Sequence, residues 1–165
     1  MEARAKLLGH PVHQMLVVFP LGLLATGVIF DLVHIGTDNV IFAYVAYWMM
    51  VAGIVGGLLA APFGFADWMK IPRDTRARRI GAVHGLGNLV IVVLFVASVL
   101  LRADNEMIPT TGAYVCSFVG AFMALFTAWL GGELVDRLGV GVHDGANVNA
   151  PSSLRTRHVG AHRGS

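Results

Sequence analysis

Four long apolar runs constrain this chain more than any other feature. They extend over about residues 13–30, 40–66, 80–101 and 112–132, and none of them contains Asp, Glu, Lys or Arg. About 20 apolar residues cross a hydrocarbon core of roughly 30 Å at 1.5 Å per residue, and each run is close to or above that length. Hydrocarbon cannot pair exposed backbone groups, so each run must be a helix. The sequence therefore predicts an all-α integral membrane protein, a bundle of four transmembrane helices.

The composition agrees with this prediction. Apolar residues make up 56% of the chain and charged residues 13%, whereas a soluble domain carries roughly 25% charged residues. We expect one domain over residues 1–144, with helices at about 12–35, 40–66, 80–102 and 112–137. The basic segment 145–165 has too little apolar content to form a core, and we expect it to be disordered.

The basic residues predict the orientation of the bundle. All twelve lysines and arginines except Arg102 fall on one side of a four-helix topology. Cytoplasmic loops carry an excess of Lys and Arg, so this side, with both termini, is predicted to be cytoplasmic. Asp31 and His34 then lie at the outer end of the first helix, where we interpret them as interfacial residues.

Five ionisable side chains are predicted at the cytoplasmic level of the membrane, and every helix contributes at least one of them. Ionisable groups in a membrane are costly, so their position suggests a function. The set predicts a cofactor or metal site formed by facing helices, as in other bundles. Its residues are His10, His13, Asp67, His84 and Glu133.

Two kinds of ligand suit this set. Imidazole and carboxylate groups together fit an iron, zinc or manganese ion, with His13 and His84 as primary ligands and His10 as a further candidate. Asp67 and Glu133 would be ligands or partners that orient an imidazole. The alternative is haem b, with two of the three histidines His10, His13 and His84 as axial ligands. The arginines that would then pair with the haem propionates are Arg76, Arg78 and Arg79.

A purely structural interpretation remains open beside these two. His10 and His13 then cap a helix, and His84 forms a hydrogen-bonded packing pair with Asn88. In the same interpretation, Asp67 pairs with an arginine of the adjacent basic loop, and Glu133 pairs with Arg137.

No enzymatic reaction is predicted. The sequence has no phosphate-binding glycine-rich loop, no nucleophile-elbow pattern and no paired His-Glu-x-x-His motif. The arginines near the C-terminus are too few to indicate nucleic-acid binding. Small residues at a spacing of four favour close helix packing, and they leave a homo-oligomer open. They lie at Gly53, Gly57 and Ala61, and at Gly120, Ala124, Ala128 and Gly132.

Several segments resemble a bacterial family of predicted membrane proteins named domain of unknown function 2231. The matching segments are Gly-His-Pro-Val-His at residues 9–13, Phe-Gly-Phe-Ala-Asp-Trp at 63–68, Arg79 with His84 and Asn88, and Trp-Leu-Gly-Gly-Glu-Leu-Val at 129–135. The chain departs from the family at Asp136, where an aromatic residue is common, and at Leu138, where a histidine is common.

The resemblance implies a four-helix protein of the inner (plasma) membrane with no established activity. Relatives that occur with cytochrome c-type and quinoprotein dehydrogenase domains imply a redox role and redox partner proteins. Our leading hypothesis is therefore a membrane protein that binds a metal ion or haem and serves electron transfer. The alternatives are a non-catalytic accessory subunit that packs on a partner membrane protein, and a metal-ion transporter.

Overall fold

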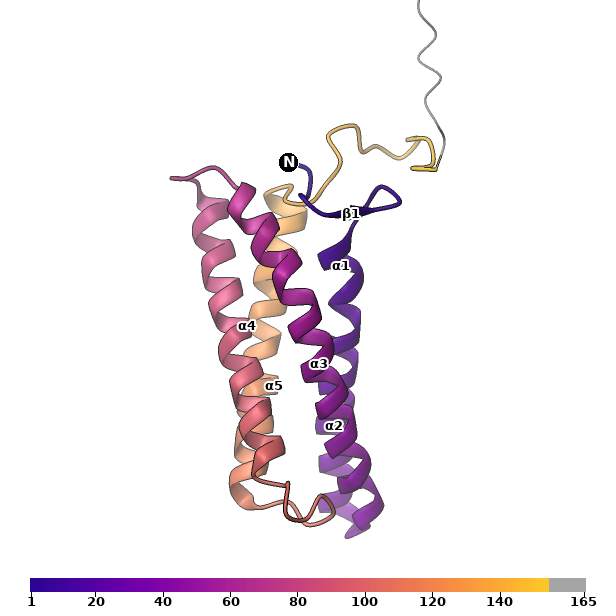
Figure 1. Ribbon diagram of the computed structural model, residues 1–165, viewed down its shortest axis with the longest axis vertical. Helices are drawn as coiled ribbons and strands as arrows, with labels where there is room; N and C mark the ends of the chain where they lie inside the picture. Colours follow the sequence, from indigo (N-terminus) through magenta and orange to yellow (C-terminus); the bar gives the residue numbers. More distant parts are fainter. Residues whose placement is uncertain (155–165) are drawn as a thin grey trace, which may run out of the picture.

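The computed structural model describes residues 1–154 and contains the four long helices expected from the sequence. They are α2 (Val18–Thr37), α3 (Val40–Lys70), α4 (Arg76–Leu100) and α5 (Thr111–Gly132), with a short α1 (Val12–Leu16) ahead of α2. The long helices run lengthwise through one bundle (Figure 1). All four spans are long and apolar enough to cross a membrane. The predicted all-α fold is confirmed, and the predicted cytoplasmic orientation of the termini stays a prediction.

The first predicted helix, at about residues 12–35, is divided in the structure. α1 ends at Leu16 and α2 begins at Val18, two residues before Pro20. Proline has no backbone N–H, so the carbonyl of Leu16 loses the partner that residue 20 would normally supply. The chain direction is nevertheless kept, because the N–H of Val17 donates to the His13 carbonyl at 3.1 Å.

Side-chain caps fix where three helices begin. The Asn39 side chain accepts from the N–H of Ile41 ahead of α3, and the Thr110 hydroxyl accepts from that of Ala113 ahead of α5. Thr75 caps α4 in the same way, by accepting from the N–H of Arg78 at 3.1 Å. The cap lets α4 start four residues before the predicted boundary at residue 80, so its first turn is basic.

The bundle consists of two halves. α2 packs most extensively on α3, and α4 on α5, while contacts between the pairs are fewer. Each pair is a helical hairpin, linked by Asp38 and Asn39 in the first half and by residues 101–110 in the second. We call the end with these two links the hairpin end. The opposite end, which carries residue 1 and the segment after α5, is the terminal end (Figure 1).

The core lies between the helices at mid-height. Its buried members are Leu24, Met50, Ile54, Ile91 and Phe95. Many other large apolar side chains point outward, among them Phe122 and Leu125, which are 75% and 71% exposed. A folded chain in water would bury most of these side chains, so this surface is suited to lipid.

The terminal end contains short elements that the sequence did not predict. Strands β1 (Lys6–Leu7) and β2 (His10–Pro11) pair as an antiparallel hairpin. Leu8 and Gly9 link them with φ of 51° and 86°, the left-handed backbone that two-residue hairpin turns require. α5 continues into a π-helical turn, η1 (Glu133–Arg137). Residues 145–154 of the predicted tail contain no helix or strand, and its remainder lies outside the described residues.

Candidate functional site

His13 is held by the neighbouring helix α3. Its Nδ1 lies 3.0 Å from the carbonyl oxygen of Ala60. A carbonyl oxygen only accepts, so Nδ1 carries the proton and the neutral ring keeps a lone pair on Nε2. The imidazole covers Gly64 so closely that a Cβ there would lie 2.6 Å from its Cε1. Glycine at residue 64 therefore makes room for the ring.

His84 has the same arrangement in the other half of the bundle. Its Nδ1 donates to the carbonyl of Thr127 in α5 at 2.9 Å, which again leaves the lone pair on Nε2. A Cβ at Gly131 would lie 3.2 Å from the His84 Cε1. Asn88 Nδ2 donates to the His84 carbonyl at 2.8 Å and to His84 Nε2 at 3.2 Å. The predicted His84–Asn88 pair is therefore present, and it extends to the Thr127 hydroxyl, 3.3 Å from Asn88 Oδ1.

The two imidazoles form what we call the imidazole pair, His13 and His84. Both are partly buried. Each is oriented by a main-chain carbonyl of the adjacent helix in its own half. Each half of the bundle thus presents one imidazole with an Nε2 lone pair.

The other three predicted ligands have separate roles in the structure. His10 is exposed in β2, with Nε2 3.3 Å from the Ser153 hydroxyl. Asp67 is buried, and its Oδ1 accepts from the main-chain N–H of Arg4 at 2.5 Å. Glu133 accepts from Arg76 Nη2 at 2.6 Å. Within residues 1–154, no three His, Cys, Asp or Glu side chains gather closely enough to hold an ion. The structure brings two of the five residues into matching positions and does not assemble all five.

The three arginines expected near haem propionates also differ from one another. Arg76 is committed to the ion pair with Glu133. Arg78 donates to the main-chain carbonyls of Trp68 and Ile71, and its guanidinium stacks 3.7 Å from the centre of the Trp68 ring. Arg79 is exposed and makes no ion pair within the described part of the chain.

The sequence analysis missed a buried ion pair at the hairpin end. Arg102 binds Asp31 with two hydrogen bonds, Nη1 to Oδ1 at 2.7 Å and Nη2 to Oδ2 at 2.6 Å. Both side chains are fully buried, and the Ser117 hydroxyl lies 3.4 Å from Asp31 Oδ2. Tyr114 covers the guanidinium, whose centre is 5.5 Å from its ring. The interpretation of Asp31 as an interfacial residue is therefore wrong.

One sequence signal pointed to this pair. Arg102 is the single basic residue that departs from the charge bias, and Asp31 is the single acid inside the first span. Both residues fall at the same predicted membrane level. An isolated acid and an isolated base at one level of a membrane indicate a partnership, because each alone would be costly.

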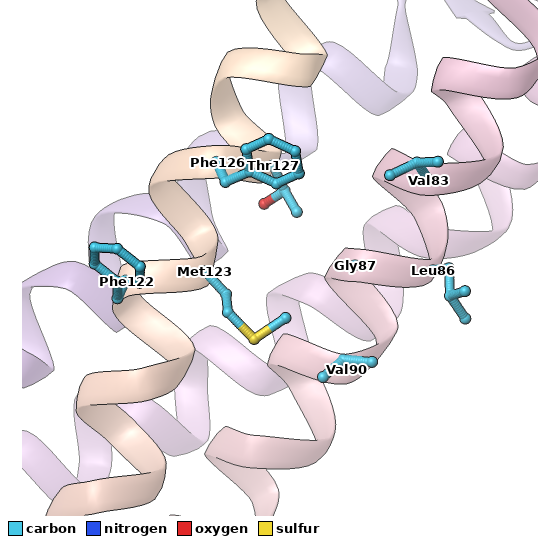
Figure 2. A pocket seen from close by; sticks show the side chains of 8 residues that line it. All are labelled: Val83, Leu86, Gly87, Val90, Phe122, Met123, Phe126 and Thr127. Atoms are coloured by element: carbon cyan, nitrogen blue, oxygen red, sulfur yellow. The ribbon is translucent and has the colours of Figure 1, made fainter.

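An apolar groove lies between α4 and α5, on the outer surface of the bundle (Figure 2). Its volume is about 470 Å³, and its lining residues are Val83, Leu86, Gly87, Val90, Phe122, Met123, Phe126 and Thr127. Leu86 and Phe122 are 65% and 75% exposed, so the groove opens outward. Such a lining matches acyl chains of the surrounding lipid.

Comparison with known proteins gives one match. The model of a family described as predicted membrane protein (DUF2231) matches residues 9–144. No curated protein and no solved structure matches the chain. The matched region contains the imidazole pair, both halves of the bundle and the buried ion pair. The chain belongs to the DUF2231 family of predicted membrane proteins.

Proposed function

We propose that this membrane protein binds haem b through the imidazole pair, His13 and His84, and serves electron transfer. The observation that carries the proposal is the matched tautomer of the two rings. Each Nδ1–H donates to a main-chain carbonyl, at 3.0 Å for His13 and 2.9 Å for His84, and each Nε2 keeps its lone pair. Ligating histidines nearly always anchor their other nitrogen in this way, which fixes the ring and raises its basicity.

The number of ligands favours haem over a bare ion. A haem iron needs only two protein ligands, because the porphyrin supplies the other four. Protein sites for zinc use three or four side chains, and none of the described residues adds a third to the imidazole pair. When bound, haem would supply a one-electron iron couple. The residues of the protein would hold the iron, orient the imidazoles and exclude water.

The residues around the two rings also suit this role. Gly64 and Gly131 leave space for the imidazoles on the faces of α3 and α5. Asn88 does not block His84, because its amide keeps a 2.8 Å hydrogen bond to the His84 carbonyl when Nε2 binds elsewhere. The ligands come from opposite halves of the bundle, between which helix contacts are fewer than within each half.

We further propose that the terminal end faces the cytoplasm and that the protein lies in the inner membrane. The charge bias supports this orientation, since Arg102 is the only basic residue at the hairpin end among residues 1–154. Arg102 is also neutralised by Asp31, so no net basic charge remains at that end.

The first test is a visible absorption spectrum of the full chain, purified in detergent after expression with haem precursor, together with elemental analysis of bound metals. We expect a Soret band and one iron per chain, with the reduced-state bands of a bis-histidine haem. His13→Ala and His84→Ala should each remove the low-spin bis-histidine spectrum and lower haem content at least several-fold.

His34 provides a matched control. Its Nδ1 also lies 3.0 Å from a main-chain carbonyl, that of Asn39, and it is partly buried like the imidazole pair, but it lies at the hairpin end. His34→Ala should leave the spectrum unchanged, as should His10→Ala. Stoichiometric zinc, iron or manganese without a Soret band would refute haem and favour an ion site. Folded protein with neither metal nor haem would refute both and favour the accessory-subunit alternative.

A further inference from the structure

Residues 1–5 cross the terminal end of the bundle from one half to the other, and we call them the strap. The Met1 carbonyl accepts from the N–H of Gly141, in the segment that follows η1. The Glu2 carbonyl accepts from Lys70 Nζ, at the end of α3. Ala3 is buried, with 4% of its surface exposed. The strap is therefore packed on the bundle and tied to both halves.

The strap also ends beside the start of α1, the helix that carries His13. The Ala5 carbonyl accepts from the N–H of Val12 at 3.0 Å, and Val12 directly precedes His13. The hairpin of β1 and β2 brings the chain back from Ala5 to this point. Any movement of the strap is thus transmitted to the first turn of α1, which carries His13.

Asp67 holds the middle of the strap. Its carboxylate is 9% exposed, and Oδ1 accepts from the main-chain N–H of Arg4 at 2.5 Å. Both this hydrogen bond and the one from Lys70 involve a charged side chain, but the Lys70 contact is exposed to solvent and the Asp67 contact is partly buried. The carboxylate has no other polar contact in the described part of the chain, so it serves neither helix capping nor an arginine pair.

We propose that the strap is a releasable cover over the terminal end and that Asp67 is its latch. Release of the Arg4–Asp67 hydrogen bond would free the segment that precedes His13 and expose this imidazole to water, and a ligand would enter and leave by that path. The identity of the ligand as haem rests on the proposed function above, while the cover and its latch do not. This role accounts for Asp67, the predicted ligand that lies apart from the imidazole pair.

The direct test is hydrogen exchange of the full chain in lipid nanodiscs, followed over residues 1–11. Asp67→Ala should speed exchange of this segment by about ten-fold or more, since it removes a charged hydrogen-bond partner. Asp67→Asn keeps an acceptor oxygen and should give a smaller increase. Exchange over α3 and α5 should not change, which would show that the variants are folded.

A second measurement reports access and does not depend on haem. In a Cys116→Ser background, His13→Cys places a thiol at the site, and its reaction with a water-soluble maleimide measures exposure. Adding Asp67→Ala should speed the reaction by about ten-fold, by the same loss of the latch. Asp136→Ala is the matched control, because Asp136 is an 84% exposed acid at the same end whose one ion pair is with its neighbour Arg137.

Unchanged exchange and unchanged labelling in Asp67→Ala would overturn the latch. Faster exchange and labelling in a protein that shows no Soret band would support the latch and refute only the haem assignment. A Soret band together with unchanged exchange and unchanged labelling in Asp67→Ala would support the haem assignment and refute only the latch.

Discussion

The two ends of the bundle join the same two halves by different chemistry. At the hairpin end, Asp31 from α2 binds Arg102 from the second half, and both side chains are fully buried. At the terminal end, the halves are bridged by a main-chain strap, and each of two imidazoles donates its Nδ1–H to a main-chain carbonyl, with Asn88 at the Nε2 of His84. The hairpin end has one acid and one base paired inside the protein. The terminal end keeps ligand atoms available, which is why we assign stability to the first and chemistry to the second.

The largest effect is expected from breaking the buried ion pair. Asp31→Ala or Arg102→Ala leaves one uncompensated buried charge, which should cost about 3–5 kcal/mol of unfolding free energy. Reversible unfolding in mixed detergent and dodecyl sulfate micelles measures this loss.

The double variant Asp31→Leu, Arg102→Met is the control for this prediction. It removes both charges and should recover most of the stability, because a buried pair is often replaced by apolar residues without loss. Single variants that lose less than about 1 kcal/mol would show that the pair is solvated and that the two ends do not differ in this way.

A graded series of glycine substitutions tests how tightly the imidazoles are held. A Cβ at Gly64 would lie 2.6 Å from His13 and one at Gly131 would lie 3.2 Å from His84, while Gly85 has open space around it. Gly64→Ala should therefore cost about 1–3 kcal/mol through overpacking. Gly131→Ala should cost less, and Gly85→Ala should be neutral or slightly stabilising.

The same unfolding assay measures the series, and the proposed haem spectrum should shift in the same order. An equal effect at all three glycines would mean that helix propensity, and not contact with the rings, decides the outcome.

A smaller effect is expected at the Arg76–Glu133 ion pair. Arg76 is 55% exposed and Glu133 is 17% exposed, so solvent weakens the attraction. Glu133→Gln should cost about 0.2–1 kcal/mol and leave bound metal and haem unchanged. Elemental analysis checks the second point, and loss of metal in this variant would restore Glu133 as a ligand.

The smallest effect concerns the strap and pH. The hydrogen bond from Lys6 lowers the pKa of Glu2 below its usual 4.5, so the folded state binds this proton less readily than the unfolded state. The stabilisation is complete above the usual pKa and is lost as the pH falls through the lowered pKa. Hydrogen exchange of residues 1–11, corrected for intrinsic rates, should rise as the pH falls below 4.5 in the wild type relative to Glu2→Gln. Parallel pH profiles for the two proteins would count against this contact.

Most of the fold could be predicted because it depends on the length of the apolar segments. Segments such as residues 40–66 are too long and too apolar for any element but a spanning helix, and the structure extends this one only to Lys70. The errors are local. Thr75 moves the start of α4 outward through a single cap, and Pro20 divides the first helix through a single missing N–H.

The site could be predicted only in part. A sequence gives the depth of a residue in the membrane better than the direction in which its side chain points. All five proposed ligands belong to the terminal end, as expected from depth. Only His13 and His84 have matching anchors, which depend on carbonyls of other helices and leave no sequence signal. Asp31 and its partner Arg102, 71 residues away, differ in this respect, because an isolated acid and an isolated base at one membrane level were a signal that the sequence analysis did not use.

The short link of the first half has a consequence for biosynthesis. Only Asp38 and Asn39 separate α2 from α3, and Asp38 takes the left-handed backbone, φ 57°, that reverses the chain. Two residues extend over about 7 Å, which is less than the width of a helix. The linked ends of α2 and α3 must therefore stay adjacent. They should therefore leave the insertion machinery together as one hairpin. The ten residues between α4 and α5 impose no such coupling, so the second pair can insert one helix at a time.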